Sequence, residues 1–409
     1  MGKSIKSTSK FKIITLFLSI ALCVVTFSGC YDNSEIEDLA YVMAIGIDEA
    51  DSNSFNLTFQ TAVPKSITGV GGGGGESTVV SSFKTDNFLT GIKKANEYLS
   101  RNINLSHTKI IVVSENIAKK GVAAFLSGLQ QNMEIRPNVN IIVASEGAKK
   151  YIESIQPKLT SNPSKYYDLL FKTYQTDFLV PSTQLEDYLY RAKNYGAQPV
   201  AIYTEIDKAI DESKPSSGEG DEKSDGESKK SGDSEKKNMS IKGLAVFKMD
   251  KMVGKLGPEE ATLFALLTGS NNNVKIEVTD PLDKRFKVLG NVIKEKASSN
   301  KVKIKDGKPK ININLKLNID VQAVQSDNNY DEPDKAAKLK IAYEDYLNKG
   351  IKSLLQKVTY KFKSDIFGYG EFAKQNFKTI DQWENVKWPE IFPQSQYDCK
   401  LDLKITRQG

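Results

Sequence analysis

Three cysteines and one histidine are the side chains of this 409-residue chain best suited to act as nucleophiles or metal ligands. Cys30 follows the small residues Ser28 and Gly29, which end an apolar stretch over residues 13–27. Four lysines and no acidic residue precede that stretch. A basic start, an apolar middle and small residues before the cleavage point are typical of a secretory leader. We therefore expect residues 1–29 to be removed and Cys30 to carry diacylglyceryl and N-acyl groups, as in bacterial lipoproteins.

Two other interpretations of this segment stay open. It could be an ordinary cleaved leader with a cysteine there by chance, or an uncleaved N-terminal anchor. The apolar stretch has about 15 residues, whereas a helix that spans a bilayer needs roughly 20. Acyl chains contribute about 0.8 kcal/mol per buried CH₂, so two or more of them hold a protein firmly. The mature chain is expected outside a membrane and tethered to it.

His107 is the sole histidine, and it precedes the apolar run Ile110–Val113. It cannot form a histidine metal cluster, so we interpret it as a residue that packs or hydrogen-bonds at a strand entrance. With Cys23 lost in the leader and Cys30 lipidated, Cys399 has no intramolecular disulfide partner. We interpret Cys399 as a small core side chain. The sequence predicts no metal site, no cofactor and no catalytic residue, and its ligand-binding residues are unknown.

Acidic and aromatic residues offer two further candidates. Glu35, Glu37 and Asp38 have the spacing of a solvated turn or helix start. Sequence does not exclude a glycosidase pair, because such pairs assemble in space. Trp383 and Trp388 could form an exposed recognition ridge, or belong to an extended strap whose indoles cover the C-terminal sheet. The strap is favoured, because a tryptophan buries a large area.

Most of the net positive charge of the chain lies in the expected leader. The formal charge is +6, and removal of four lysines with residues 1–29 leaves +2. A nucleic-acid-binding protein needs a basic face, which this balance does not suggest. The lysines over Lys301–Lys310 alternate with apolar residues, so we interpret them as the solvated side of strands. No nucleic acid partner is predicted.

The first region, residues 30–206, is expected to be an N-terminal mixed α/β domain. Short apolar runs predict its strands at Leu39–Ile47, Phe55–Thr61, Ile110–Val113, Val139–Ala144 and Pro199–Thr204. Helical spacing predicts helices at Phe88–Leu99 (capped by Thr85 or Asp86), Ile117–Leu129, Lys149–Ile155, Ser164–Tyr174 and Thr183–Lys193.

Residues 207–240 are expected to be a disordered, charged linker or insert. Its centre, Asp211–Lys237, contains one proline and no aromatic or aliphatic residue, so it cannot bury enough surface to offset its chain entropy. A long insertion between adjacent strands costs little in loop closure. The glycine run Gly69–Gly75 is interpreted as a flexible loop.

Two regions follow the insert. Residues 241–272 are expected to be a small middle region, with a hairpin of Ile241–Phe247 and Met252–Leu256 and a helix from Pro258. Residues 273–409 are expected to form a C-terminal α+β domain. Its predicted elements are the alternating strand Ile311–Val321, the closing strand Tyr397–Ile405 and a long helix over Pro333–Asp365 that buries Ile341, Tyr346, Ile351, Leu354, Leu355 and Val358.

Several sequence blocks resemble one known family in the same order. The opening block is GCYDNSEIEDLAYVMAIGID (Gly29–Asp48), and it resembles the start of the C subunits of spore germinant receptors, the Ger(x)C lipoprotein family. The family usually has Trp where this chain has Tyr31. The later matching blocks are LSHTKIIVVSENIAKKGV (Leu105–Val122), EIRPNVNIIVASEGA (Glu134–Ala148), GLAVFKMDKMVGKLGPEE (Gly243–Glu260) and DIFGYGEF (Asp365–Phe372).

This resemblance implies a fold and a function. The fold is mixed α/β (α+β), with three domains whose mixed or antiparallel sheets are flanked by helices, after a cleaved lipoprotein signal peptide. The function is that of a nonenzymatic subunit, anchored by lipid at the outer face of the spore inner membrane. Its partners are a larger multispanning A subunit and a transporter-like B subunit, and together they sense nutrients in germination. Only Cys30 receives a role residue by residue.

An alternative function is a substrate-binding lipoprotein of an importer. That function requires two lobes joined by a hinge, with polar groups converging on the cleft between them. An envelope hydrolase is a third hypothesis. The charged insert and the strand-rich last third do not favour the importer.

Overall fold

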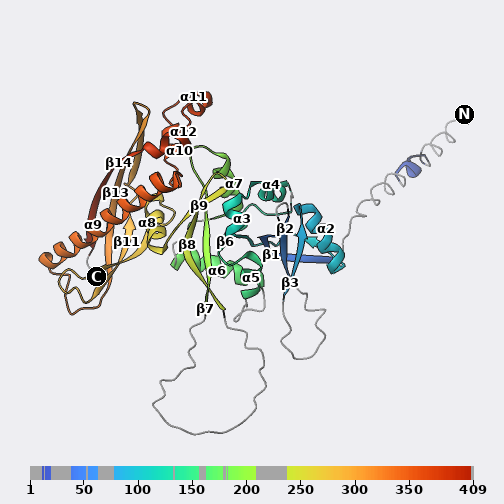
Figure 1. The fold of residues 1–409 in the computed structure, drawn as a ribbon, viewed down its shortest axis with the longest axis horizontal. Coiled ribbons are helices and arrows are strands. Elements are labelled where there is room, and N and C mark those ends of the chain that lie inside the picture. Colours follow the sequence, from blue (N-terminus) through green and yellow to red (C-terminus); the bar gives the residue numbers. More distant parts are fainter. Residues whose placement is uncertain are drawn as a thin grey trace, which may run out of the picture.

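The computed structural model describes residues 12, 14–19, 38–51, 54–62, 78–131, 134–155, 163–177, 181, 183–208 and 237–406 (Figure 1). The expected lipidation site Cys30 lies outside these residues, as do Glu35, Glu37 and the glycine run Gly69–Gly75. Residues 211–236 of the charged span also lie outside them.

A nine-stranded mixed sheet organises the first half of the described chain. Its order is β3-β2-β1-β5-β6-β7-β8-β9, with the short β4 paired to β1. The central strands β1, β5, β6 and β7 are parallel, and both edges are antiparallel. The bounds are β1 Leu39–Glu49, β2 Phe55–Ala62, β3 Thr78–Thr85, β4 Asn102–Asn104, β5 Ile110–Ser114, β6 Asn140–Ala144, β7 Val200–Lys208, β8 Lys237–Lys248 and β9 Lys251–Leu256.

Helices cover both faces of this sheet, which is why its central strands are almost continuously apolar. One hydrophobic cluster joins one face to α2 (Phe88–Leu99), α3 (Glu115–Lys120), α4 (Ala123–Gln131) and α7 (Leu185–Lys193). The other cluster joins the second face to α5 (Ala148–Ser154), α6 (Pro163–Asp177) and α8 (Pro258–Thr268), and continues into the C-terminal part.

Local backbone chemistry changes two of the predicted helices. The helix predicted over Ile117–Leu129 is two helices, α3 and α4, because the chain turns at Gly121, whose φ is 123°. The residue that caps α2 is Asn87, whose side chain accepts the Thr90 N–H, and not Thr85 or Asp86 as predicted.

The predicted hairpin of residues 241–256 is present, and it continues the first sheet. Its strands β8 and β9 pair with each other, and β8 also pairs with β7. That pairing extends to Lys208 and Lys237, so both ends of the expected linker, 207–208 and 237–240, are strand. Side-chain chemistry alone did not indicate this, because the paired ends are polar apart from Met239.

We expect the chain to fold without the charged insert. Deletion of Ser213–Lys236 leaves residues 209–212 between the paired Lys208 and Lys237, and four residues suffice for a hairpin loop. The shorter loop loses less chain entropy on closure, so the free energy of unfolding should be unchanged or rise by about 1 to 2 kcal/mol. Urea unfolding of both forms measures this. Loss of cooperative unfolding in the deletion form would contradict the prediction.

A second, five-stranded sheet forms the C-terminal part. Its order is β10-β11-β13-β12, and β14 lies parallel along β13. The bounds are β10 Asn273–Thr279, β11 Lys287–Lys294, β12 Ser299–Lys305, β13 Lys308–Val324 and β14 Gln396–Thr406. Alternate residues are buried and exposed along β10 and β13, so one face is covered and the other faces solvent.

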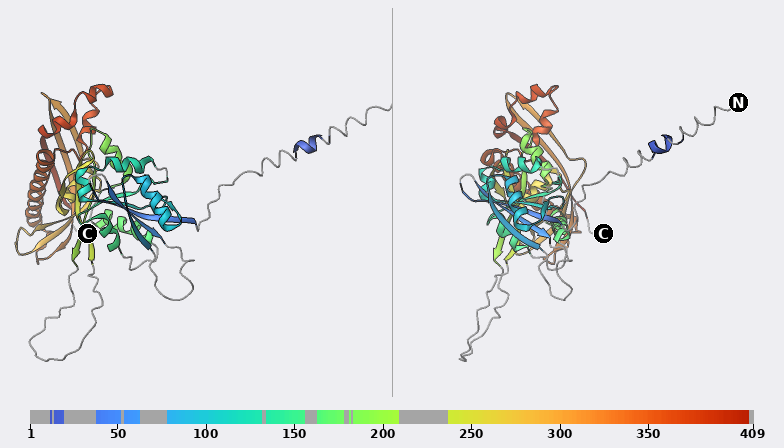
Figure 2. Two further views of the ribbon diagram at one scale, coloured as in Figure 1. Left: turned by 45° about the vertical axis from the view of Figure 1, so that its right-hand side comes forward. Right: turned by 90° about the vertical axis from the view of Figure 1, so that its right-hand side faces the viewer.

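Helices α8 and α9 (Pro333–Gln356) cover the buried face of this sheet (Figure 2). The buried side of α9 is Leu339, Tyr343, Leu347, Ile351, Leu354 and Leu355. Ile341, predicted to be buried, is 57% exposed because it lies two residues from Leu339 and so faces away. The predicted helix to Asp365 ends early, since a π-helical turn occupies Lys357–Phe362.

The segment with both tryptophans is helical, and its two indoles are buried. Its short helices are α10 (Tyr369–Lys374), α11 (Ile380–Glu384) and α12 (Trp388–Ile391). Trp383 and Trp388 are 4% and 1% exposed, with ring centroids 5.9 Å apart. The covering role is therefore correct and the exposed ridge is wrong, although the segment is helical and not extended.

The mixed α+β class and the division into more than one unit agree with the fold predicted from sequence. Strand pairing divides the described residues between two sheets, whereas the family resemblance implies three domains.

Candidate functional site

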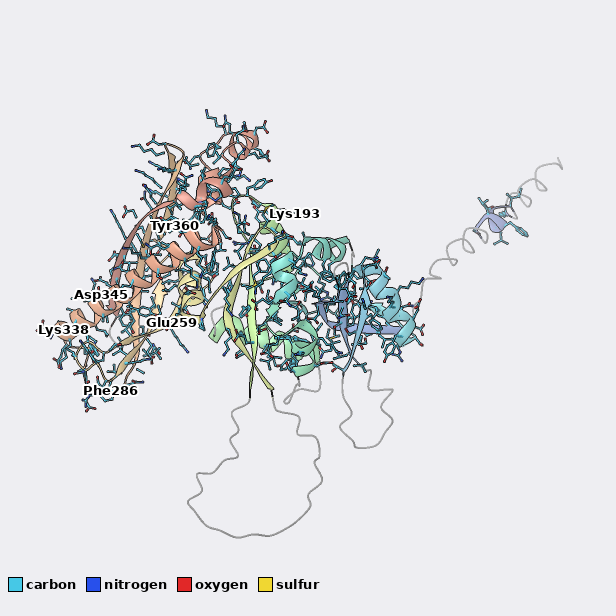
Figure 3. The ribbon with its side chains drawn as sticks, viewed as in Figure 1. Lys193, Glu259, Phe286, Lys338, Asp345 and Tyr360 are labelled. Atoms are coloured by element: carbon cyan, nitrogen blue, oxygen red, sulfur yellow. The ribbon has the colours of Figure 1, made fainter. Side chains whose placement is uncertain are left out.

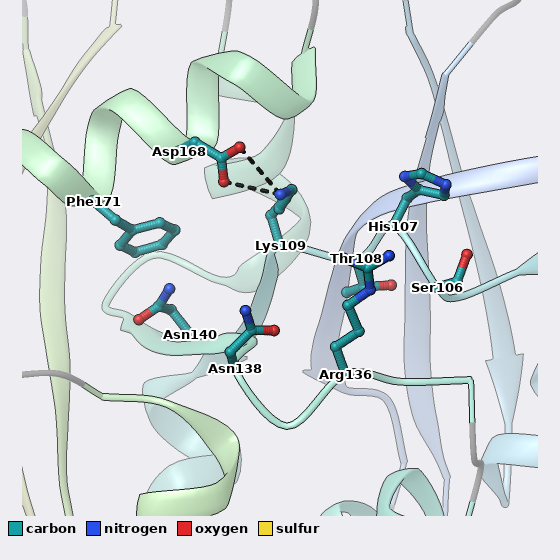
Figure 4. Close-up of a pocket in the computed structure, with 9 residues that line it drawn as sticks. All are labelled: Ser106, His107, Thr108, Lys109, Arg136, Asn138, Asn140, Asp168 and Phe171. Atoms are coloured by element: carbon teal, nitrogen blue, oxygen red, sulfur yellow. Dashed lines mark hydrogen bonds and ion pairs between the residues drawn. The ribbon is translucent and has the colours of Figure 1, made fainter.

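A small polar pocket opens at the amino ends of β5 and β6, in the middle of the first sheet (Figure 4). Its volume is about 60 Å³, enough for water molecules or part of a small polar solute. The lining residues come from the segments that lead into the two strands and from α6: Ser106, His107, Thr108, Lys109, Arg136, Asn138, Asn140, Asp168 and Phe171.

The charged side chains that line this pocket are one ion pair and an arginine. The Lys109 ammonium lies 2.9 Å from Oδ1 of Asp168 and donates to Oδ2 at 3.1 Å, as the dashed lines in Figure 4 mark. The Asp168 side chain is 60% exposed, so solvent screens the pair and it contributes at most about 1 kcal/mol. Arg136 adds a further positive charge from an exposed position. The pair could therefore exchange its partners for a polar ligand at small cost.

His107 lies at the rim of the pocket and packs edge-on against Tyr41, with ring centroids 5.1 Å apart. This is the packing role predicted for it. In the part of the chain that the structure describes, no group of three or more His, Cys, Asp or Glu side chains could hold a metal ion. The hydroxyls, amides and ion pair of the pocket are suited to binding by hydrogen bonds.

At the carboxyl ends of the parallel strands, the protein's own side chain fills the place where a ligand could bind. Open parallel sheets commonly bind ligands at the carboxyl ends of their strands. Here the carboxylate of Asp48, near the end of β1, accepts the N–H groups of Ala148 at 2.7 Å and Lys149 at 2.8 Å. These N–H groups begin α5, where negative charge is favourable. A carboxylate of the chain thus occupies the position that an anionic ligand would take.

A buried carboxylate organises the segment that follows the long C-terminal helix. Asp365 is 3% exposed and follows the π-helical turn. Its oxygens accept four N–H groups: Gly368 at 3.0 Å, Tyr369 at 3.2 Å, Gly370 at 2.8 Å and the Trp388 indole at 2.9 Å. Burial raises the pKa of Asp365 to about 6, although these four donors act to lower it.

The same segment and the preceding Ser364 contact strand β8 and the loop that leads into β7. The Gln198 N–H donates to the Asp365 carbonyl at 2.8 Å. The Ser364 hydroxyl donates to the Phe247 carbonyl at 2.5 Å. A Cβ atom at Gly370 would lie 2.5 Å from the Gly196 carbonyl oxygen, so these two backbone segments approach as closely as glycine permits. We call Asp365–Phe372 the junction segment.

Sequence reasoning identified only some of these residues. Cys399 is half-buried on β14, and burial raises the pKa of its thiol to about 11, as suits a core side chain. Arg136, Asp168 and Asp365 were not singled out. For Arg136 and Asp365 the available signal was their position in the blocks Glu134–Ala148 and Asp365–Phe372, since polar residues beside buried strands often line sites. Asp168 lies outside both blocks and offered no such signal.

None of the described helices combines the length and the apolar character required to cross a membrane.

Most of the chain is similar to known protein families and to individual relatives. Residues 32–206 match the family model "Spore germination protein N-terminal domain". Residues 242–409 match "Spore germination B3/ GerAC like, C-terminal". The chain is 25% identical over 405 residues to spore germination protein KC of Bacillus subtilis (strain 168), covering 96% of this chain and 95% of that protein.

Two further similarities have the same extent. Spore germination protein GerQC of Bacillus cereus is 21% identical over 399 residues, covering 97% of this chain and 98% of that protein. The crystal structure of the GerBC protein aligns with a TM-score of 0.52 at 16% identity, covering 91% of this chain and 99% of that chain. The structural match indicates a shared fold.

Proposed function

This chain belongs to the spore germination B3/GerAC-like family, and from that premise we propose that it is the C subunit of a nutrient germinant receptor. The observation that carries the proposal is the succession of both family domains, in order, over residues 32–206 and 242–409. The relatives carry spore germination names and are matched over nearly their whole length.

The proposal includes an anchor and a location. Cys30 is the acylated N-terminus after removal of residues 1–29, and it holds the chain at the outer face of the spore inner membrane. The leader composition supports this, because basic, apolar and small residues follow one another up to Cys30. The partners are the multispanning A and B subunits of the receptor.

The proposed role is nonenzymatic assembly and signalling. The polar pocket supports this role, because its groups suit binding and not bond cleavage. The junction segment also supports it, since the Asp365 carboxylate holds this segment in shape while the Asp365 carbonyl bonds to Gln198 of the first half of the chain, and this contact can make the relative position of the two sheets sensitive to a partner. An importer's binding protein has its cleft between two lobes, whereas this pocket lies within one sheet and its covering helix.

Deletion of the gene tests the proposed function. In spores whose other nutrient receptors have been removed, the deletion should abolish nutrient-triggered loss of optical density, and a gene copy in trans should restore it. Germination by a stimulus that bypasses the receptors is the control and should be unchanged. Full nutrient germination in the deletion strain would contradict the proposal.

A further inference from the structure

Five lysines gather on the solvent face of one hairpin in the C-terminal sheet. The hairpin joins β12 to β13 through a turn at Asp306 and Gly307, which both have positive φ. The exposed lysines, which we call the lysine patch, are Lys301, Lys303, Lys305, Lys308 and Lys310.

Strand register places these side chains on one face. Lys303 pairs with Lys310, and Lys305 pairs with Lys308. In each pair, two positively charged side chains stand directly opposite each other across the hairpin. Neighbouring strands are about 4.8 Å apart and alternate residues about 6.8 Å apart, so the patch is a dense array. Like charges placed directly opposite destabilise a sheet. The hairpin therefore keeps an arrangement that is unfavourable in isolation.

No partner within the described chain neutralises the patch. None of its five lysines forms an ion pair among the described residues. The carboxylate on the adjoining strand β14, Asp398, stands opposite Asn312. Along the rest of β14 the exposed charges alternate in sign, as Lys400, Asp402 and Lys404. The excess of positive charge is thus local to the hairpin.

We propose that the lysine patch docks on an anionic lipid bilayer, as a second membrane contact besides the Cys30 anchor. The inference rests on the proposed function through that anchor. Asp38 is eight positions after Cys30, a reach of at most about 28 Å, so the folded chain is held close to the bilayer surface. The patch has no exposed aromatic residue to act as a protein-binding hot spot. A dense lysine array is complementary in charge to an anionic headgroup layer.

The opposite side of this sheet provides a matched control. Helix α9, drawn in front of the sheet in Figure 1 and bearing the labelled Lys338 in Figure 3, covers the other face. Its exposed lysines Lys338, Lys349 and Lys352 point to solvent. They lie across the sheet from the patch, so they cannot touch the same bilayer surface.

Vesicle sedimentation tests the proposal. The chain from residue 30 with Cys30→Ser is used, because both hydrophobic clusters draw all their residues from position 40 onward. It should bind vesicles of phosphatidylcholine mixed with phosphatidylglycerol, more weakly as NaCl rises, and should not bind pure phosphatidylcholine. Lys301→Gln, Lys303→Gln and Lys310→Gln together should weaken binding about 100-fold, at roughly fivefold per lysine. The α9 triple variant, with Lys338, Lys349 and Lys352 changed to Gln, should bind as the parent does.

Equal binding by the patch variant and its parent, or no binding to anionic vesicles, overturns the proposal. So does a salt-sensitive association of the patch with an acidic polypeptide such as polyglutamate that vesicles do not compete away. Circular dichroism checks folding, and the patch variant should be at least as stable as the parent. The assay contains no other receptor subunit, so its failure leaves the proposed function intact, and loss of that function leaves this result interpretable.

Discussion

Replacing Cys30 with alanine should move the protein from the membrane fraction to the soluble fraction of sporulating cells, or leave it as a larger precursor with its leader uncleaved. In the proposed lipidation the thiol sulfur receives the diacylglyceryl group, and alanine has no such nucleophile. Without acyl chains the chain loses an anchor worth about 0.8 kcal/mol per buried CH₂, which is far more than the lysine patch supplies. Fractionation and immunoblotting measure the change.

Cys23→Ala is the control for that variant. Cys23 lies in the apolar part of the leader, so alanine there should leave cleavage, acylation and membrane association unchanged. Intact-mass measurement of the purified protein should show an acylated N-terminus at residue 30 in the parent and in Cys23→Ala. A Cys30→Ala protein that is cleaved normally and stays on the membrane would show that the anchor had been assigned wrongly.

Replacing Asp365 with alanine should be the most destabilising single change in the C-terminal part. It removes the acceptor of four N–H groups at once, and those groups would stay buried without partners. The expected loss in the free energy of unfolding is about 3 to 5 kcal/mol. Asp365→Asn keeps one of the two acceptor atoms and should lose less. Chemical unfolding followed by tryptophan fluorescence measures both, since Trp388 is one of the donors.

Asp345→Ala on α9 is the matched control for this prediction, because Asp345 is exposed (Figure 3). It should change the free energy of unfolding by less than about 0.5 kcal/mol. An Asp365→Ala protein as stable as Asp345→Ala would show that water replaces the lost acceptor, and that the junction segment does not depend on this carboxylate.

The raised pKa of Asp365 should make the free energy of unfolding depend on pH. Its pKa in the folded chain is raised to about 6, above the ordinary aspartate value of about 3.8, by burial that outweighs the N–H donors. Between these two values the unfolded chain binds fewer protons than the folded chain, so stability falls as pH rises from about 4 to 6. The difference in unfolding free energy between the parent and Asp365→Asn should therefore change across this window and be constant above it. A constant difference from pH 4 to 8 would contradict the raised pKa.

Regular patterns made much of the fold predictable. Strands such as Ile110–Val113 and the alternating Ile311–Val321 appear where apolar residues are continuous or alternate, because burial on one or two faces dictates those patterns. The break between α3 and α4 was missed, since one glycine with positive φ overrides an otherwise continuous helical spacing. Ile341 was misplaced because a long helix offers more than one apolar stripe, and only packing selects which is buried.

The candidate sites were less predictable because they depend on pairings distant in sequence. Asp168 reaches Lys109 across 59 positions, and the indole of Trp388 reaches Asp365 across 23. Asp365 meets the backbone of Gln198 only after the two sheets have packed. The lysines of β12 and β13 were recognised as a solvated strand face. Their mutual opposition follows from register, which composition does not contain.

Affinity isolation from spore inner membranes tests the central claim most directly. The tagged, lipidated protein is solubilised in mild detergent, and every protein that stays bound is identified by mass spectrometry. The account predicts two multispanning partners in constant ratio, absent from a parallel isolation of an unrelated tagged lipoprotein. Recovery with an importer's permease, or with no multispanning partner, would contradict the assignment as a receptor C subunit.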